Sequence, residues 1–209
     1  TENPGSSQFK IAGKTLKPTM TGLADGILLE DKDVTAKTAA LSVNVANESI
    51  CYGYFLWNYS ADADKLRNSG DLLNIRKQYF QCTNKEGKQN ISAIVGPIHQ
   101  GDNLLVRITL KAKTDLAHVI IDDQRPAGTE PLTSENVTVV QGDLQFRQLP
   151  RDQKTDFYIL KIPKGTHTLE YKLQAVHKGL FSSGVAKAHC LFAPEVNAHS
   201  TSTSVTIKP

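Results

Sequence analysis

The amino-acid sequence predicts an all-β protein, an antiparallel β-sandwich with a smaller N-terminal β-region. Three observations favour this class. Apolar and polar residues alternate in many short segments, which is the pattern of a strand with one buried and one hydrated face. Turn-forming residues separate these segments about every ten to fifteen residues. No helical stripe of apolar residues continues over ten or more positions, so helices are not expected to dominate the fold.

The stretch 152–196 shows the alternation most clearly. Its first segment, 157–162, ends at the turn formed by Pro163-Lys164-Gly165. In the second segment, one face carries Leu169, Tyr171, Leu173 and Ala175, and the other carries Thr168, Glu170, Lys172 and Gln174. A third segment places on one face Ala186, Ala188, Cys190 and Phe192, and it is expected to end at Ala193-Pro194. We expect these three segments to be strands of one antiparallel sheet.

Other segments continue the pattern along the chain. Residues 1–8 are polar and are expected to be disordered or to be an artificial chain end. An apolar patch lies at 27–29. Strands are predicted, in order, as two short strands within 9–16, an alternating segment at 41–45, an aromatic central strand at 50–59, then 75–82, 104–112, 119–121 ended by Asp122-Asp123, a hairpin of 137–140 with 144–146, and 205–207.

The polar segment 60–71 interrupts these strands and is predicted to be a domain boundary. This boundary gives a β-region at 9–71 and a sandwich at 72–209. A helical turn is expected only within 65–73.

Composition excludes several classes of function. The chain has 209 residues, 39% hydrophobic and 22% charged, with a net charge of +3. That charge is too small over this length to predict binding to nucleic acid or to a membrane surface. No apolar run is long enough to span a bilayer, and no signal peptide is present. Because the first residue is Thr1 and not Met, we expect the chain to be a processed or excised piece.

The residues that usually carry chemistry do not form a recognisable site, so no catalytic, cofactor-binding or metal-binding residue is predicted. Cys51, Cys82 and Cys190 lack metal-ligand spacing and are expected to be buried free thiols. The alternative is a single disulfide between two of them. The histidines are scattered, and the adjacent His189 and Cys190 would face opposite sides of a strand. The six histidines are His99, His118, His167, His177, His189 and His199.

Two further groups of polar residues have simple structural explanations. Ser182-Ser183-Gly184 lacks the Gly-x-Ser-x-Gly pattern of a nucleophile elbow and is expected to be a loop. The carboxylate pairs Asp122-Asp123 and Asp62/Asp64 resemble calcium ligands only weakly, since carboxylates at strand ends are usually solvated. The sequence therefore offers no arrangement of residues around a nucleophile that would indicate an esterase or a protease.

Several motifs of the second half are shared with a known family. They are Arg151-Asp152, Thr155, Phe157-Tyr158, Pro163 to Thr166, Leu169 to Tyr171, Phe192 to Val196 and His199-Ser200, preceded by Asp123 to Gly128 and the turn Gly128 to Pro131. Over 72–209 this set resembles the C-terminal macroglobulin-like domain of bacterial alpha-2-macroglobulins. The resemblance implies a macroglobulin- or immunoglobulin-like sandwich. The part 9–71 resembles, more loosely, the second half of the CUB-like domain that in this family a helical thioester domain interrupts.

The resemblance also implies a function. Members of the family trap proteases, and many contain a Cys-Gly-Glu-Gln thioester motif. This chain lacks that motif, since Cys51 is followed by Tyr52-Gly53-Tyr54. The resemblance therefore implies a non-enzymatic C-terminal fragment of a protease inhibitor, acting as a packing and recognition module. Its expected partners are other domains of the parent chain, including the thioester-like helical domain, and proteases through the parent. The expected location is periplasmic or at the cell surface.

An alternative is a carbohydrate-binding or adhesin-like sandwich of a secreted protein. The aromatic segment 50–59, which contains Trp57, has the residues of a platform for stacking sugars, although a strand packed on both faces explains it better. Glycan binding that Trp57→Ala abolishes would support this alternative.

Overall fold

The computed structural model describes residues 8–11, 14–16, 19–20, 25–26, 35, 41–44, 62, 65–85 and 88–209. Within these ranges the chain contains many β-strands and no α-helix, which confirms the all-β prediction. The chain divides into two compact units, 1–58 and 59–209.

The smaller unit contains a three-stranded antiparallel sheet and a short strand pair. The sheet has the order β2-β1-β5, in which Phe9 of β1 lies opposite Leu16 of β2 and Val43 of β5. These strands are β1 (Gln8–Ile11), β2 (Lys14–Leu16), β3 (Thr19–Met20), β4 (Asp25–Gly26) and β5 (Leu41–Asn44), with β3 paired to β4. The two short strands predicted within 9–16 are therefore confirmed. The segments 27–29 and 50–59, with Cys51 and Trp57, lie outside the described residues.

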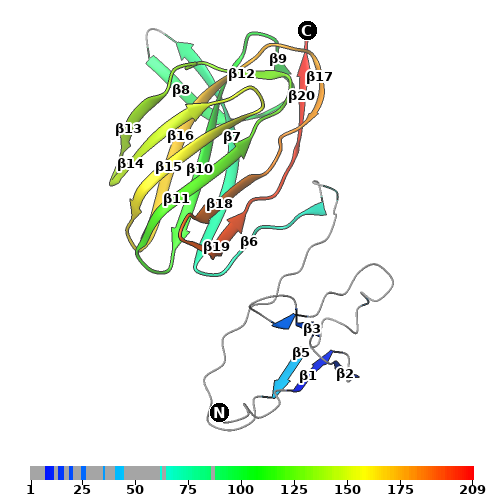
Figure 1. The fold of residues 1–209 in the computed structure, drawn as a ribbon. Coiled ribbons are helices and arrows are strands. Elements are labelled where there is room, and N and C mark those ends of the chain that lie inside the picture. The colour runs from blue at the N-terminus through cyan, green and yellow to red at the C-terminus, as the bar shows by residue number, and fades with distance from the viewer. Residues whose placement is uncertain are drawn as a thin grey trace. The chain divides into compact units, whose positions relative to one another are not determined.

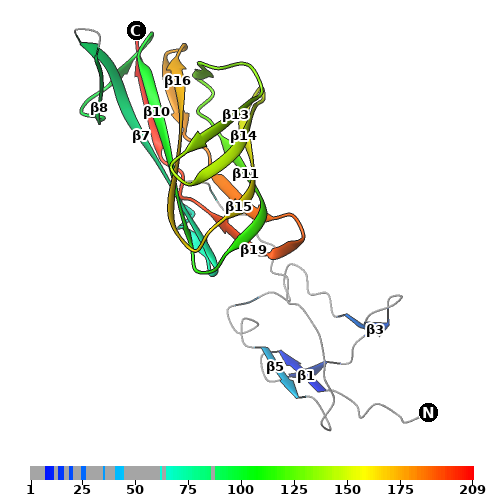
Figure 2. The ribbon, with the colours of Figure 1, turned by 90° about the vertical axis from the view of Figure 1, so that its left-hand side faces the viewer.

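The larger unit is a sandwich of two main sheets, which Figure 2 shows nearly edge-on. The first sheet has the order β12-β16-β10-β7-β8 and comprises β12 (Thr129–Pro131), β16 (Gly165–Ala175), β10 (Asn103–Ala112), β7 (Leu73–Lys85) and β8 (Lys88–Ala93). The second has the order β13-β14-β15-β11-β18-β19-β6 and comprises β13 (Val137–Gln141), β14 (Leu144–Pro150), β15 (Lys154–Ile162), β11 (Leu116–Gln124), β18 (Ala186–Cys190), β19 (Ala193–His199) and β6 (Ser69–Gly70).

A small third sheet completes this unit. Its order is β17-β20-β9, formed by β17 (Gly179–Ser182), β20 (Ser204–Lys208) and β9 (Ile98–His99), and Figure 1 shows β17 and β20 side by side next to the C-terminus. β20 pairs antiparallel with β17 and parallel with β9.

The core lies between the two main sheets, as the alternation predicts. Register places Val106 of β10 opposite Tyr171 of β16, and both side chains point inward and are buried. From the other sheet, Phe146 and Phe157 are completely buried, and their ring centroids lie 5.8 Å apart. Burying each such side chain contributes about 1.5–3 kcal/mol, so this apolar layer holds the two sheets together.

Some predicted ends differ from the structure. The strand expected at 119–121 extends from Leu116 to Gln124, because the Asp123 side chain points into the sandwich and has a partner there. Ala193-Pro194 begins β19 instead of ending a strand, since Pro194 lies where an exposed strand starts. The helical turn expected within 65–73 is wrong for its second half, where Ser69-Gly70 forms β6 and Leu73 begins β7.

The predicted boundary between domains lies close to β6. This strand pairs with β19, and the smaller compact unit ends at Asn58, earlier than the predicted end at Asp71. The assignment of 9–71 to half of a CUB-like domain stays a prediction. The hairpin predicted at 137–146 is confirmed by β13 and β14, joined through Gly142 at a φ of 59°.

Candidate functional site

A buried ion pair joins the two main sheets. Lys77 Nζ of β7 lies 2.6 Å from Asp123 Oδ1 of β11, and the two side chains are 1% and 0% exposed. No hydrogen bond of standard geometry reaches this oxygen, so the contact is an ion pair. The other carboxylate oxygen accepts a hydrogen bond of 2.6 Å from the Tyr171 hydroxyl. Lys77 also donates to the carbonyl oxygens of Gln124 and, at 3.0 Å, Ser183.

Burial shifts the ionisation of this cluster. Desolvation lowers the pKa of Lys77, and the Asp123 carboxylate opposes part of that change. Burial raises the pKa of Tyr171 well above 10, and it does the same for Tyr79, whose hydroxyl donates to the Ser183 carbonyl at 3.1 Å. Perturbed groups of this kind occur in active sites, but here the ionisable atoms of Lys77, Asp123 and Tyr171 are buried and contact one another. We assign the cluster a structural role.

A second buried cation organises the loops at the same end of β11. Arg125 has a side chain that is only 3% exposed, and its guanidinium donates to backbone carbonyls from two separate stretches of the chain. The acceptors are the carbonyl oxygens of Thr129, Arg151, Asp152 and Lys154. The planar five-donor group of arginine fits several carbonyls at once, which a lysine ammonium does not.

The outer face of the second sheet carries a group of exposed and half-buried apolar and aromatic side chains, which we call the aromatic patch. It consists of His118 on β11, Tyr158 and Leu160 on β15, and Leu191 and Phe192 in the turn between β18 and β19. Phe192 is 76% exposed, Leu160 60% and Leu191 45%. Exposed apolar side chains that gather in one place usually mark a protein-interaction site.

Ring contacts hold the patch in one arrangement. The His118 ring lies edge-on to Phe192, with centroids 5.1 Å apart and an interplanar angle of 79°. It also lies 6.1 Å from the Tyr158 ring, and His118 Nδ1 forms a hydrogen bond with the Tyr158 hydroxyl. Edge-to-face pairs of this kind are favourable beyond simple burial, so the patch is organised before any partner arrives.

His118 has an unusual backbone conformation. Its φ of 53° lies in the left-handed region, and β-pairing between β11 and β15 passes from Ala117↔Lys161 to Val119↔Ile159 without it. The His118 carbonyl oxygen accepts a 2.8 Å hydrogen bond from the Leu191 backbone amide. A non-glycine residue in this region costs free energy, and such strain gathers at functional positions. This distortion brings the turn with Phe192 onto the sheet.

Sequence reasoning missed the aromatic patch. It placed Phe192 on the buried face of a strand with Cys190, which is wrong because the register of β18 and β19 shifts after His189 and the chain turns outward. It treated His118 as one of several scattered histidines. The signal in the sequence was the pair of bulky residues Tyr158 and Leu160, which alternate with Phe157 and Ile159 and so lie on the opposite face of their strand.

The other candidate residues do not come together as a site. Asp123 points into the sandwich, whereas Asp122 points out to Lys154 at 2.5 Å, so the pair does not share a cation. The Ser182 hydroxyl lies 2.9 Å from the Ser202 hydroxyl, whereas the Ser183 hydroxyl donates to the Gly184 carbonyl and accepts from the Thr203 amide. Among the described residues, no group of three or more His, Cys, Asp or Glu side chains is placed to hold a metal ion. Cys82 and Cys190 are free thiols.

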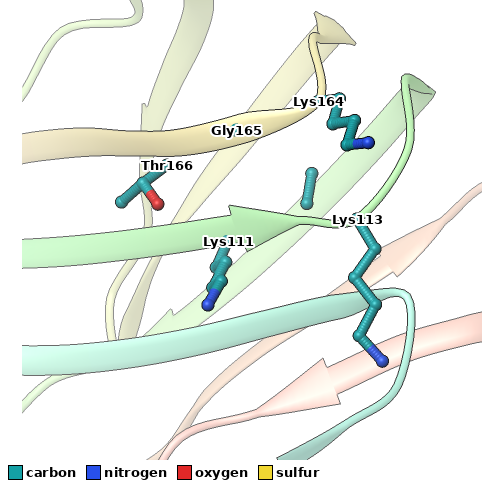
Figure 3. A pocket seen from close by; sticks show the side chains of 6 residues that line it. Lys111, Lys113, Lys164, Gly165 and Thr166 are labelled. Atoms are coloured by element: carbon teal, nitrogen blue, oxygen red, sulfur yellow. The ribbon is translucent and has the colours of Figure 1, made fainter.

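A shallow hollow of about 410 Å³ lies at the end of β10 and carries positive charge. Figure 3 shows the side chains of Lys111, Lys113 and Lys164 around it. Lys113 pairs with Asp71 at 2.6 Å, and the Asp115 carboxylate accepts a hydrogen bond from the Lys164 backbone amide. All three lysines are exposed, which is the arrangement of a solvated sheet end.

Comparison with known proteins identifies the family. The family model for the MG10 domain of bacterial alpha-2-macroglobulin matches residues 73–195 of the sequence. The chain belongs to this family. It is 27% identical over 185 residues to the alpha-2-macroglobulin of Rickettsia conorii, covering 79% of this chain and 9% of that protein. The chain therefore spans about a tenth of the length of this relative.

Solved structures of the bacterial alpha-2-macroglobulin family share the fold. The native Escherichia coli protein, from domain MG7 to the C-terminus, matches 68% of this chain and 24% of that one, with a TM-score of 0.55 and 18% identity. The Salmonella protein reacted with methylamine matches 69% of this chain and 10% of that one, with a TM-score of 0.53 and 19% identity. In the described part of the chain, no helix is long and apolar enough to cross a membrane.

Proposed function

We propose that this chain is a non-catalytic part of a longer bacterial alpha-2-macroglobulin-like protease inhibitor, and that it packs against another domain of its parent through the aromatic patch. The observation that carries the proposal is the exposure of Phe192 and Leu160 on a patch in which the His118 ring contacts Tyr158 and Phe192. The family match and the short share of the relative's length support a parent chain with further domains.

The physical argument rests on what an exposed apolar surface costs. A phenylalanine that is 76% exposed keeps most of its ring in water, and burying it contributes about 1.5–3 kcal/mol. Three such side chains gathered around His118 supply the central apolar area that a domain interface needs. The proposed occupant is the thioester-like helical domain, and the proposed location of the parent is the periplasm or the cell surface, as the family resemblance implies.

Footprinting with a small carbene label tests the packing. Labelling of Phe192 and Leu160 is measured in the 209-residue chain and in the complete parent protein. We expect labelling to fall at least fivefold in the parent, because a neighbouring domain covers the patch. Leu180, which is 73% exposed on β17, is the control and should be labelled alike in both. Equal labelling of the patch in both proteins would refute the packing role.

A second experiment tests the inhibitory role of the parent. Trypsin is incubated with the complete parent, and its remaining activity is measured on a large protein substrate. We expect this activity to fall, and to fall less with the double variant Phe192→Ser and Leu160→Ser than with the control Leu180→Ser. A parent that leaves trypsin fully active would contradict protease inhibition. The glycan-binding alternative rests on Trp57, outside the described residues, and stays a prediction.

A further inference from the structure

One edge of β7 has no pairing strand along its first half. β10 pairs with β7 from Leu73 to Cys82 on one side. On the other side β8 pairs only from Phe80 onward, and no other strand of the described part of the chain pairs with 73–79. An unpaired edge presents free N–H and C=O groups that can accept another strand.

The direction of these backbone groups follows from one hydrogen bond. The Lys113 amide donates to the Leu72 carbonyl at 2.9 Å, one step beyond the register of β7 with β10. In an antiparallel pair such bonds occur at alternate residues, so the odd-numbered residues Ile75, Lys77 and Tyr79 direct their backbone groups to the free side. The Lys77 side chain is 1% exposed although the residue as a whole is half-buried, so its exposed surface belongs to the main chain.

β20 has a free edge of the same kind. It pairs with β17 along its first four residues, and β9 meets its other side only at Ile207 and Lys208. The Ser183 amide donates to the Thr203 carbonyl at 2.7 Å. Because such bonds occur at alternate residues, the odd-numbered residues of β20 direct their backbone groups toward β17. Ser204 and Thr206 therefore direct their backbone groups away from β17, and both residues are exposed. The parallel register of Ile207 with Ile98 engages the Thr206 carbonyl, which leaves the Ser204 backbone groups and the Thr206 N–H unpaired.

These two edges line one hollow of about 560 Å³, which we call the edge slot. Its ends are closed by the connection from Ile94 to Ile98 and by Asn68, whose side-chain oxygen accepts a 2.8 Å hydrogen bond from the Thr201 amide. The lining contains no carboxylate, whereas Arg76 is exposed at its side. Lys77 is already neutralised by Asp123, so Arg76 supplies the free charge.

We propose that the edge slot binds an extended acidic peptide segment, which adds a strand between β7 and β20. Neighbouring strands of a sheet lie about 4.8 Å apart. Both β7 and β20 direct unpaired backbone groups into the edge slot, and these groups can bond to a strand placed between them. Addition of a strand to an open edge is an established mode of peptide recognition. An acidic side chain of the peptide pairs with Arg76. The edge slot and the aromatic patch share no residue, so the two proposals stand or fall separately.

Amide hydrogen exchange of the full chain tests the free edges. We expect fast exchange at Lys77, Tyr79, Ser204 and Thr206, and exchange at least tenfold slower at Gln78, whose amide bonds to β10. Uniform protection along both strands would overturn the proposal, because the edges would then already be paired.

Peptide binding tests the occupant. The probe is an acetylated, amidated peptide of alternating threonine and valine with two central glutamates, and its matched control has two central lysines. Addition of the glutamate peptide should slow exchange at the four slot-facing amides, with at least tenfold weaker binding of the lysine peptide. Absence of binding of the glutamate peptide at about 1 mM, or equal binding of both peptides, would overturn the proposal.

Three variants separate backbone pairing from charge. Thr206→Pro removes the N–H that points into the edge slot, and it should weaken glutamate-peptide binding about fivefold, the usual effect of one lost hydrogen bond. Thr206→Ala keeps that N–H and should bind as the native protein does. Arg76→Glu should reverse the preference between the two peptides, and this variant decides the question if Thr206→Pro does not fold. An unchanged preference in Arg76→Glu would contradict the role of charge.

Discussion

Replacement of Asp123 by asparagine should destabilise the sandwich strongly. Its carboxylate lies 2.6 Å from Lys77 Nζ, with both side chains almost fully buried. Removing one partner of a buried ion pair leaves an uncompensated charge and costs about 3–5 kcal/mol. Lys77 retains the carbonyl oxygens of Gln124 and Ser183 as acceptors, and asparagine still accepts a hydrogen bond from Tyr171. We therefore expect the lower end, about 3 kcal/mol.

Urea unfolding followed by circular dichroism measures this loss. With an unfolding slope of about 1.5–3 kcal/mol per molar urea, the midpoint should fall by about 1–2 M. The neighbouring residue gives a matched control. Asp122 pairs with Lys154 at the surface, and its side chain is 31% exposed. Asp122→Asn should therefore cost less than about 1 kcal/mol.

A double variant tests whether the ion pair is the cause. Lys77→Met removes the buried ammonium, so Asp123→Asn in that background should cost at least about 2 kcal/mol less than it does alone. Additive effects of the two substitutions, or equal losses for Asp122→Asn and Asp123→Asn, would refute the reasoning.

Two further predictions concern other buried groups. Burial raises the pKa of Tyr79 and Tyr171 well above 10, whereas the unfolded chain releases these protons near pH 10, so their contribution to stability is complete below about pH 10 and is lost above it. Urea midpoints between about pH 9 and 11 should fall less steeply in Tyr171→Phe than in the native chain, and equal slopes would argue against this origin. Arg125→Lys should lower the free energy of unfolding by about 2–4 kcal/mol, because one ammonium cannot serve the separate carbonyls that the guanidinium bonds. A loss below about 1 kcal/mol in urea unfolding would contradict that role.

Local sequence patterns were sufficient for most strands of the sandwich. Side chains alternate with a period of two in any strand, so Leu169, Tyr171 and Leu173 indicate the buried face without knowledge of the partner strand. Turn residues such as Gly142 mark a hairpin for the same local reason, since a positive φ is accessible to glycine at little cost.

The aromatic patch depends on contacts that are distant in sequence. His118 meets Tyr158 40 residues later, and Leu191 lies still further along the chain. A register shift between β18 and β19 turns Phe192 outward, and no local pattern shows such a shift.

What the sequence by itself determined was the all-β class, the inward faces of the strands and the family motifs, because each depends on residues close together in the chain. What only the tertiary structure decided was which polar groups meet. Asp123 ends an apolar segment in the sequence and looks solvated, yet it is buried because β7 brings Lys77 to it across the sandwich. The free edges of β7 and β20 likewise exist only because strand order leaves them unpaired, and strand order is a property of the whole fold.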